Sequence, residues 1–346
     1  MAGTLRDWLV LTRGSNLPTV WSNVLAGWLV GTHARVFSMP DDEGWKVPPD
    51  DPGWGALMLL LAAVSLTYAG GMILNDAFDA AWDAERRPSR PIPAGRVRRA
   101  DAFAAGFAAL GLGWLGTCLA APAETRAQAA LFAVALAAAV LVYDRWHKGR
   151  AFAPAVMGLC RALLPFIGMI AAGWPVALPA LLPNDIGHTT LDVMLWVHAA
   201  TLWALTFCIT VVARHEAGPA APPRWPEALL YLLPLPLLLV SDWPAWSAWS
   251  AAWCVAYWAW IFASSRRHPL PAGVGARVAD RLASFPFLDA VVYGNLALLH
   301  VICLRKVKVI HPEMKAFLWV GLVLAVLGPV LAVMATLRLR RTIPQT

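Results

Sequence analysis

The sequence predicts an all-α fold, a polytopic bundle of transmembrane helices with nine to ten spans, and three observations lead to this prediction. The 346 residues are 59% hydrophobic and only 14% charged, whereas soluble domains carry about 25% charged residues. Apolar runs of about 17–22 residues recur along the chain, and each can cross a hydrocarbon core of about 30 Å. Nineteen Trp residues suit this class, since indole rings favour the membrane–water interface.

The expected spans follow one another with short connections. They lie at about Leu17–Gly31, Trp54–Leu74, Ala100–Ala121, Ala127–Val142, Pro154–Gly173, Val193–Val212, Glu227–Val240, Trp246–Phe262, Phe287–Cys303 and Phe317–Leu337. The seventh run is short and contains Pro234 and Pro236, which interrupt helices, so nine and ten spans both stay open. We expect one membrane domain over 1–346, with a motif-bearing half at about 13–219 and further spans at about 220–346.

Basic residues gather in the connections between the spans. The formal net charge of +7 therefore indicates orientation in a membrane, and no nucleic-acid partner is expected. The most basic connection follows the second span and holds Arg86, Arg87, Arg90, Arg96, Arg98 and Arg99. Because cytoplasmic loops carry the excess of Lys and Arg, we expect this connection at the cytoplasmic face of a bacterial inner (cell) membrane. Five Cys stand singly in apolar runs, which indicates neither a zinc site nor a disulfide framework.

The stretch 75–97, NDAFDAAWDAERRPSRPIPAGRV, places carboxylates and arginines where the second span ends. Asp76, Asp79 and Asp83 are spaced i, i+3 and i+7, so a continuing helix would stack all three on one face. Carboxylates that lie so near one another repel and need a counter-charge. Hard divalent cations with oxygen ligands supply one, and Mg²⁺ is the expected cofactor.

Two further polar elements follow apolar runs on the same expected side. YDRWHKGR occupies 143–150, and ARHEAGP occupies 213–219. Arg161 lies within the fifth span, where a charge is costly unless it is paired or faces a wet cavity; a functional role is favoured over a snorkelling one. Together these elements predict a cavity with a polar mouth for a diphosphate and an apolar interior for a lipid chain. No Ser-His-Asp or Cys-His arrangement suggests a nucleophilic mechanism.

These residues resemble the UbiA superfamily of intramembrane prenyltransferases. Its N-D-x-x-D-x-x-x-D signature is met by Asn75, Asp76, Asp79 and Asp83, and its RP-[IL]-P-[SA]-G segment by residues 90–95. SNLPTVWSNVLAG at 15–27 also looks like the family's opening. YDRWHKG and MGLCRALL resemble one branch of the superfamily. The resemblance covers roughly 13–219 through motifs and the remainder only through hydropathy.

The resemblance implies transfer of an isoprenoid chain from an allylic diphosphate donor to a small-molecule acceptor, aromatic or quinone-type, in the membrane lipid. The residues that it implies as catalytic are Asp76, Asp79, Asp83 and Lys148, with the three carboxylates as metal ligands. Those expected to contact substrates are Asn75, Arg90, Arg161, Tyr143, Asn23 and Glu216, with Asn23 lining the acceptor pocket. Oligomeric state and prenyl chain length are not indicated.

The sequence departs from the family pattern at two places. The Y-x-x-x-K motif is met by Tyr143 and Lys148 with one extra residue between them. The second motif, D-x-x-x-D, is replaced by Arg214, His215 and Glu216, and Asp280 and Asp289 lie too far along the chain to complete it. A UbiA-like protein that binds or moves a lipid without catalysis is therefore the alternative. A phosphotransferase acting on CDP-activated alcohols ranks last, since its D-G-x-x-A-R opening is missing.

Overall fold

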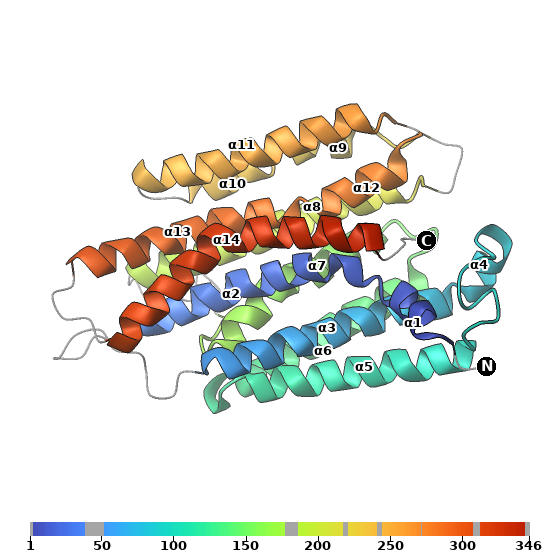
Figure 1. The fold of residues 1–346 in the computed structure, drawn as a ribbon, viewed down its shortest axis with the longest axis horizontal. Helices are drawn as coiled ribbons and strands as arrows, with labels where there is room; N and C mark the ends of the chain where they lie inside the picture. The colour runs from blue at the N-terminus through green and yellow to red at the C-terminus, as the bar shows by residue number, and fades with distance from the viewer. Residues whose placement is uncertain are drawn as a thin grey trace.

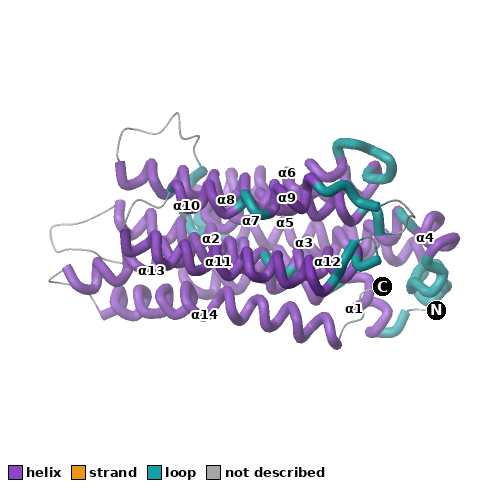
Figure 2. The backbone as a smooth tube through the Cα atoms, turned by 90° about the horizontal axis from the view of Figure 1, so that it is seen from above, coloured by secondary structure: helices purple, strands orange, loops and turns teal. Residues whose placement is uncertain are grey.

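The computed structural model describes residues 3–38, 52–176, 186–216, 221–240, 244–270, 272–306 and 312–342, and every secondary-structure element within them is a helix. The long helices run side by side between two ends of a bundle (Figure 1 and Figure 2). Helices suit a lipid environment because they satisfy all their backbone hydrogen bonds internally. The predicted all-α bundle is confirmed.

The long helices agree with the predicted spans to within a few residues at most boundaries. They are α2 (Leu17–Ser38), α3 (Gly53–Phe78), α5 (Arg99–Ala120), α6 (Ala123–Trp146), α7 (Ala153–Ala171), α8 (Ile186–Ala213), α11 (Pro244–Arg267), α13 (Phe285–Lys306) and α14 (Pro312–Thr342). Within the described ranges, α3, α5, α6, α7 and most of α8 are long and apolar enough to cross a membrane. The predicted seventh span is two short helices, α9 (Trp225–Leu230) and α10 (Pro234–Leu239), with a proline at the start of each.

The remaining elements lie near one end of the bundle. They are α1 (Leu5–Thr12), the 3₁₀-helix η1 (Gly14–Asn16), α4 (Ala80–Arg86) and α12 (Val274–Leu282). We call this end the motif end, because α4 and the loop 87–98 lie there together with α1 and the end of α14 (Figure 1). Arg340 near the end of α14 donates to Asn16 Oδ1 at 3.1 Å. The count of nine or ten spans stays a prediction.

Glycines bring α2 and α7 into direct backbone contact. A Cβ added to Gly27 would lie 1.7 Å from the carbonyl oxygen of Pro165, and one added to Gly168 would lie 2.1 Å from that of Val24. Small residues permit such close approach between helices in lipid. Because the two backbones meet, short side chains on α2 can reach α7 inside the bundle.

The short helices α1 and α12 were not predicted, since neither is long or apolar enough to resemble a span. Thr4 and Asp7 form a capping box that starts α1, in which Thr4 Oγ1 accepts from the Asp7 backbone N–H. Arg96 Nε then donates to Asp7 Oδ1 at 2.7 Å. This contact ties α1 to the loop that follows the aspartate motif.

Candidate functional site

The aspartate motif spans the junction between α3 and α4. Asn75 and Asp76 lie in the last turn of α3, Asp79 is the junction residue, and Asp83 lies in α4. The backbone N–H groups of Asp79 and Asp83 donate to the carbonyls of Asn75 and Asp79, at 3.0 and 2.9 Å. Helical hydrogen bonding therefore continues through the motif, as its spacing predicts, and the three carboxylates stay close together.

Arg90 joins two of these carboxylates. Its Nη1 lies 2.8 Å from Asp83 Oδ2 and 3.2 Å from Asp76 Oδ1, and all three side chains are at least 95% buried. The loop reaches this position through a tight turn, in which the Ala94 N–H donates to the Arg90 carbonyl and Gly95 adopts a φ of 72°. Arg13 contributes a second cation to Asp76, at 2.9 Å.

Asp79 pairs with the connection after α6. Lys148 Nζ lies 2.8 Å from Asp79 Oδ1, and His147 Nε2 lies 3.4 Å from Oδ2. Burial opposes ionisation of Asp79, but the contacts with His147 and Lys148 outweigh it and hold the pKa of this carboxyl below its ordinary value. Lys148 also lies over the ring of Trp82, 4.0 Å from its centroid. Its ammonium is therefore held between α4 and α6.

A fourth carboxylate belongs to the same region. Asp144, buried near the end of α6, accepts a hydrogen bond at 3.1 Å from Asn75 Nδ2. Sequence reasoning singled out Tyr143 and Lys148 from this connection but neither Asp144 nor His147. The signal was present in YDRWHKGR, where Asp144 stands beside Tyr143 at the end of an apolar run. Arg13 was also not among the predicted site residues, although it stands just before the first predicted span.

Two adjoining cavities open beside these side chains. The mouth cavity, of about 680 Å³, is lined by Arg13, Asn75, Asp79, Trp82, Asp83, Arg87, Arg90, Tyr143, His147, Lys148, Gly149, Ala151, Ala153, Thr210, Ala213, Arg214 and Glu216. The inner cavity, of about 260 Å³, lies within the bundle and has a mainly apolar lining that includes Val20, Val64, Leu136, Val140, Leu164, Ile209, Val278 and Leu282. Arg13, Tyr143, Thr210 and Ala213 line both. The predicted polar mouth and apolar interior are therefore both present.

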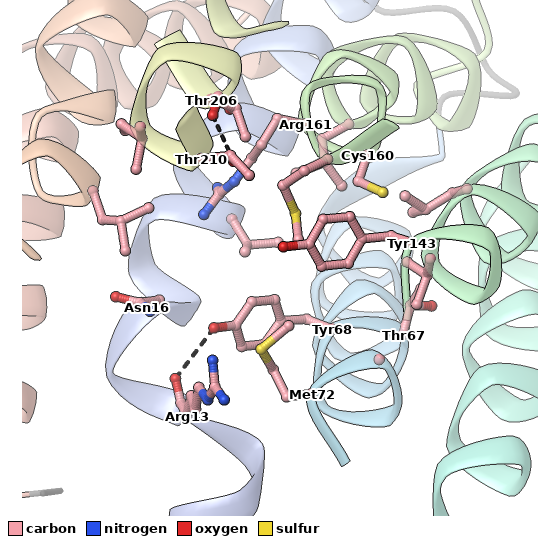
Figure 3. A pocket seen from close by; sticks show the side chains of 18 of the residues that line it. Arg13, Asn16, Thr67, Tyr68, Met72, Tyr143, Cys160, Arg161, Thr206 and Thr210 are labelled. Carbon is pink, nitrogen blue, oxygen red and sulfur yellow. Dashed lines mark hydrogen bonds between the residues drawn. The ribbon is translucent and has the colours of Figure 1, made fainter. Parts of the chain in front are cut away.

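Polar groups nonetheless reach into the inner cavity. Figure 3 shows Arg161 and Arg13 on opposite sides of it, with the hydroxyl groups of Tyr68 and Tyr143 directed toward the space between them. Tyr68 donates to the Arg13 carbonyl at 3.3 Å. The Tyr143 ring stacks on His147, a residue of the mouth cavity, with centroids 4.8 Å apart. Tyr143 therefore lies where the two cavities adjoin.

The structure separates some residues that the sequence analysis grouped. Lys148 and Arg90 line the mouth cavity, whereas Arg161 lines only the inner one. Asn23 is not among the lining residues of either cavity; it is fully buried and accepts a hydrogen bond from Arg161. Glu216 lines the mouth, with its Oε2 4.0 Å from Arg87 Nη2. The Glu216 carboxylate thus shares a cavity with the aspartate motif, while its predicted role stays untested.

The carboxylates of the site offer oxygen ligands to a divalent cation. Over the described ranges, no three His, Cys, Asp or Glu side chains gather as a metal site, because each motif carboxylate faces a protein cation. Asp83 Oδ1 and Asp144 Oδ2 are nevertheless buried oxygens with no hydrogen-bond partner. Such carboxylate oxygens are the ligands that Mg²⁺ prefers. The residues therefore fit the ion by chemistry, and the predicted roles of Asp76, Asp79 and Asp83 as ligands remain predictions.

Comparison with known proteins identifies the family of the chain. The sequence model of the UbiA prenyltransferase family matches residues 44–217, half of the chain. The chain belongs to the UbiA prenyltransferase family. With several apolar helices of membrane-spanning length, this UbiA protein is an integral membrane protein. The matched range includes the aspartate motif and α3 to α8, and it leaves α2 and the helices after 217 outside.

Parts of this UbiA chain are similar in sequence to proteins with two different names. It is 32% identical over 109 residues to the digeranylgeranylglyceryl phosphate synthase of Methanoregula boonei, a match covering 32% of this chain and 33% of that protein. It is 30% identical over 254 residues to the protoheme IX farnesyltransferase of Rhizorhabdus wittichii, covering 70% of this chain and 74% of that protein. The solved structure of a UbiA homolog from Archaeoglobus fulgidus bound to DMAPP and Mg²⁺ is similar with a TM-score of 0.50 at 14% identity, covering 83% of this chain and 99% of that one.

Proposed function

We propose that this UbiA-family protein transfers a prenyl group from an allylic prenyl diphosphate to an acceptor, aromatic or quinone-type, within the membrane. The observation that carries the proposal is the junction of the two cavities. Cations and carboxylates line the mouth cavity, and a mainly apolar cavity inside the bundle adjoins it at Arg13 and Tyr143. A diphosphate with a hydrocarbon tail matches this pairing of charge and apolar surface.

The cations of the mouth would bind the diphosphate oxygens. Arg90 and Arg13 lie on one side, where Arg can bind phosphate through two N–H groups at once. Lys148 lies on the other side and acts as a point charge. Mg²⁺ held by Asp76, Asp79 and Asp83, with Asn75 and Asp144 beside them, would supply charge neutralisation of the departing diphosphate.

The inner cavity would receive the prenyl chain. When the C–O bond to the diphosphate breaks, the allylic carbon becomes electron-poor, and the hydroxyl oxygens of Tyr68 and Tyr143, which are directed into this cavity, can stabilise positive charge there. Apolar side chains such as Val140 and Leu164 exclude water from the same space. The acceptor then forms a bond to that carbon and loses a proton.

The relatives support the donor class and leave the acceptor open. Their names, a digeranylgeranylglyceryl phosphate synthase and a protoheme IX farnesyltransferase, share a prenyl donor and differ in what is prenylated. The homolog bound to DMAPP and Mg²⁺ supports the use of the ion. We place the motif end at the cytoplasmic face of a bacterial inner membrane, because Arg86, Arg87 and the arginines that end α11 and α14 lie at that end.

A second candidate function is binding or movement of a lipid without catalysis. Two observations favour it. The motif carboxylates already face protein cations, and the sequence has one carboxylate, Glu216, in place of the second aspartate pair. Such an arrangement could hold a diphosphate through Arg90 and Lys148 without ionising it.

The test measures diphosphate release by the purified full chain with Mg²⁺, labelled prenyl diphosphates of several lengths and a membrane-lipid extract as acceptor source. We expect labelled lipid product from the wild type and its loss in Asp76→Ala and Asp79→Ala. Glu85→Ala is the matched control, because Glu85 is exposed and pairs only with its neighbour Arg86. Tight donor binding without diphosphate release at any chain length would instead support the second candidate.

A further inference from the structure

A buried polar cluster lies beside the inner cavity, formed by four helices. Its members are Thr19, Ser22 and Asn23 of α2, Arg161 of α7, His198 of α8, and Asp289 and Tyr293 of α13. Asp289 and His198 are both fully buried. Ionisable side chains inside a membrane bundle are costly and mark functional positions more often than elsewhere. Nothing in the proposed reaction so far uses Asp289.

Asp289 fixes the orientation of the Asn23 amide. Asn23 Nδ2 lies 2.9 Å from both carboxylate oxygens of Asp289, and Ser22 and His198 contact the same carboxylate. Both contacts have the Asn23 NH₂ group as donor and a carboxylate oxygen as acceptor, so the NH₂ group of Asn23 faces Asp289. Its amide oxygen then points the other way, toward α7.

That amide oxygen holds Arg161. Arg161 Nη1 donates to Asn23 Oδ1 at 2.9 Å, and Nη2 donates to Thr19 Oγ1 at 2.9 Å. The guanidinium carbon also lies 4.4 Å from the ring centroid of Phe285, one turn before Asp289 on α13. Helix α13 thus positions Arg161 twice, directly through Phe285 and indirectly through Asp289.

Arg161 is a cation at the wall of the inner cavity without a carboxylate of its own. It is 92% buried, lines that cavity, and has no Asp or Glu oxygen within 4.0 Å in the described part of the chain. Figure 3 shows its guanidinium directed into the cavity on the side opposite Arg13. A guanidinium carries five N–H donors, and the contacts with Asn23 and Thr19 use two of them.

We propose that Asp289 is a positioning residue for prenyl transfer, which acts through Asn23 to hold the Arg161 guanidinium where it binds a polar oxygen of the acceptor. This inference rests on the proposed function. The prenyl chain is a hydrocarbon and offers a guanidinium no hydrogen-bond acceptor. The diphosphate has its own cations in the mouth cavity, which Arg161 does not line. The free N–H groups of Arg161 therefore face the acceptor substrate.

The competing explanation is that the cluster only fixes how α2, α7, α8 and α13 pack. The two explanations predict different ratios of prenylated lipid to prenyl alcohol. Without an acceptor in place, water takes the prenyl group and gives prenyl alcohol; with one, the prenylated lipid forms. A packing defect lowers both products together because fewer molecules are folded. Loss of acceptor binding lowers only the prenylated lipid.

The experiment incubates the full chain with Mg²⁺, labelled farnesyl diphosphate and a membrane-lipid extract, and measures the ratio of prenylated lipid to farnesol. We expect Asp289→Asn and Arg161→Gln each to lower the ratio about tenfold, the effect of losing one charged hydrogen bond. The double variant should fall no further, because Asp289 acts through Arg161. Asp101→Asn is the matched control: it also turns a carboxylate paired with an arginine into an amide, on α5 and outside the lining of both cavities, and should leave the ratio unchanged.

If Asp289→Asn does not accumulate, Asn23→Ser interrupts the same path while Ser22 and His198 still contact Asp289, and it should lower the ratio equally. An unchanged ratio in whichever variant folds would overturn the inference, as would effects that multiply in the double variant. Both results leave the proposed function standing. Absence of diphosphate release from the wild type would overturn the proposed function and this inference with it.

Discussion

Replacing Arg90 by methionine removes the cation between two buried carboxylates of the aspartate motif. Arg90 lies 2.8 Å from Asp83 and 3.2 Å from Asp76, and its side chain is 4% exposed. Removing one partner of a buried ion pair costs about 3–5 kcal/mol, because a charge is left uncompensated. Asp76 keeps Arg13 at 2.9 Å, so the loss falls mainly on Asp83, and we expect the lower end of that range, about 3 kcal/mol.

The assay compares the free energy of unfolding of wild type and Arg90→Met in mixed micelles, with and without Mg²⁺. Arg86→Met is the control, since Arg86 pairs with Glu85 at 3.2 Å on an exposed surface, where a pair contributes about 0–1 kcal/mol. If Asp83 and Asp76 bind the ion, Mg²⁺ should stabilise Arg90→Met more than wild type, because it replaces the lost charge. A loss no larger than that of the control, or an equal Mg²⁺ effect in both proteins, would refute the reasoning.

Three further predictions concern packing, pH and the ion. Gly27→Ala should lower the thermal unfolding midpoint, because its Cβ would lie 1.7 Å from a carbonyl oxygen of α7, whereas Gly111→Ala, with nothing within 4 Å, should not; equal midpoints would contradict the backbone contact. The hydrogen bond from Arg96 holds the pKa of Asp7 below its ordinary 3.8. The ionised Asp7 therefore stabilises the folded protein at any pH above 3.8, and this stabilisation is lost as the pH falls through the lowered pKa. The midpoint difference between wild type and Asp7→Asn should hold from about pH 8 to about pH 4 and shrink only as the pH falls below 3.8 through the lowered pKa; a difference already lost at about pH 5 would contradict this. Glu216→Gln should raise the Mg²⁺ concentration needed for half-maximal diphosphate release, and an unchanged requirement would exclude Glu216 from the ion's site.

The aspartate motif shows what sequence periodicity can predict. The spacing of Asp76, Asp79 and Asp83 predicts their proximity because a helical turn fixes it locally, and the structure keeps the helical hydrogen bonds through Asp79. The pairing of each carboxylate could not be predicted in the same way. Asp79 meets Lys148 of the connection after α6, and Asp83 meets Arg90 of the loop 87–98; both are tertiary contacts, which the spacing within the motif does not encode.

The buried polar cluster shows where motif reasoning stops. Asn23 and Arg161 were identified as candidates, yet their contact depends on α2 and α7 approaching through Gly27, which no spacing along the chain encodes. Asp289 was set aside because it could not complete the second metal motif. A lone Asp within an apolar run was nonetheless a signal, since a buried charge in a span requires partners, and its partner Asn23 lies 266 residues away.

The C-terminal helices, which carry no recognised motif, close the inner cavity. Val278 and Leu282 of α12 line it, and α12 is held in place where Arg281 contacts Glu227 at 2.7 Å. The family match ends at residue 217, before α12 and α13 begin. The groups proposed to hold the diphosphate thus lie mostly inside the matched range, while several that shape the space for the acceptor lie outside it. On the proposed function, residues of the matched range bind the prenyl diphosphate, and the choice of acceptor depends in part on the last helices.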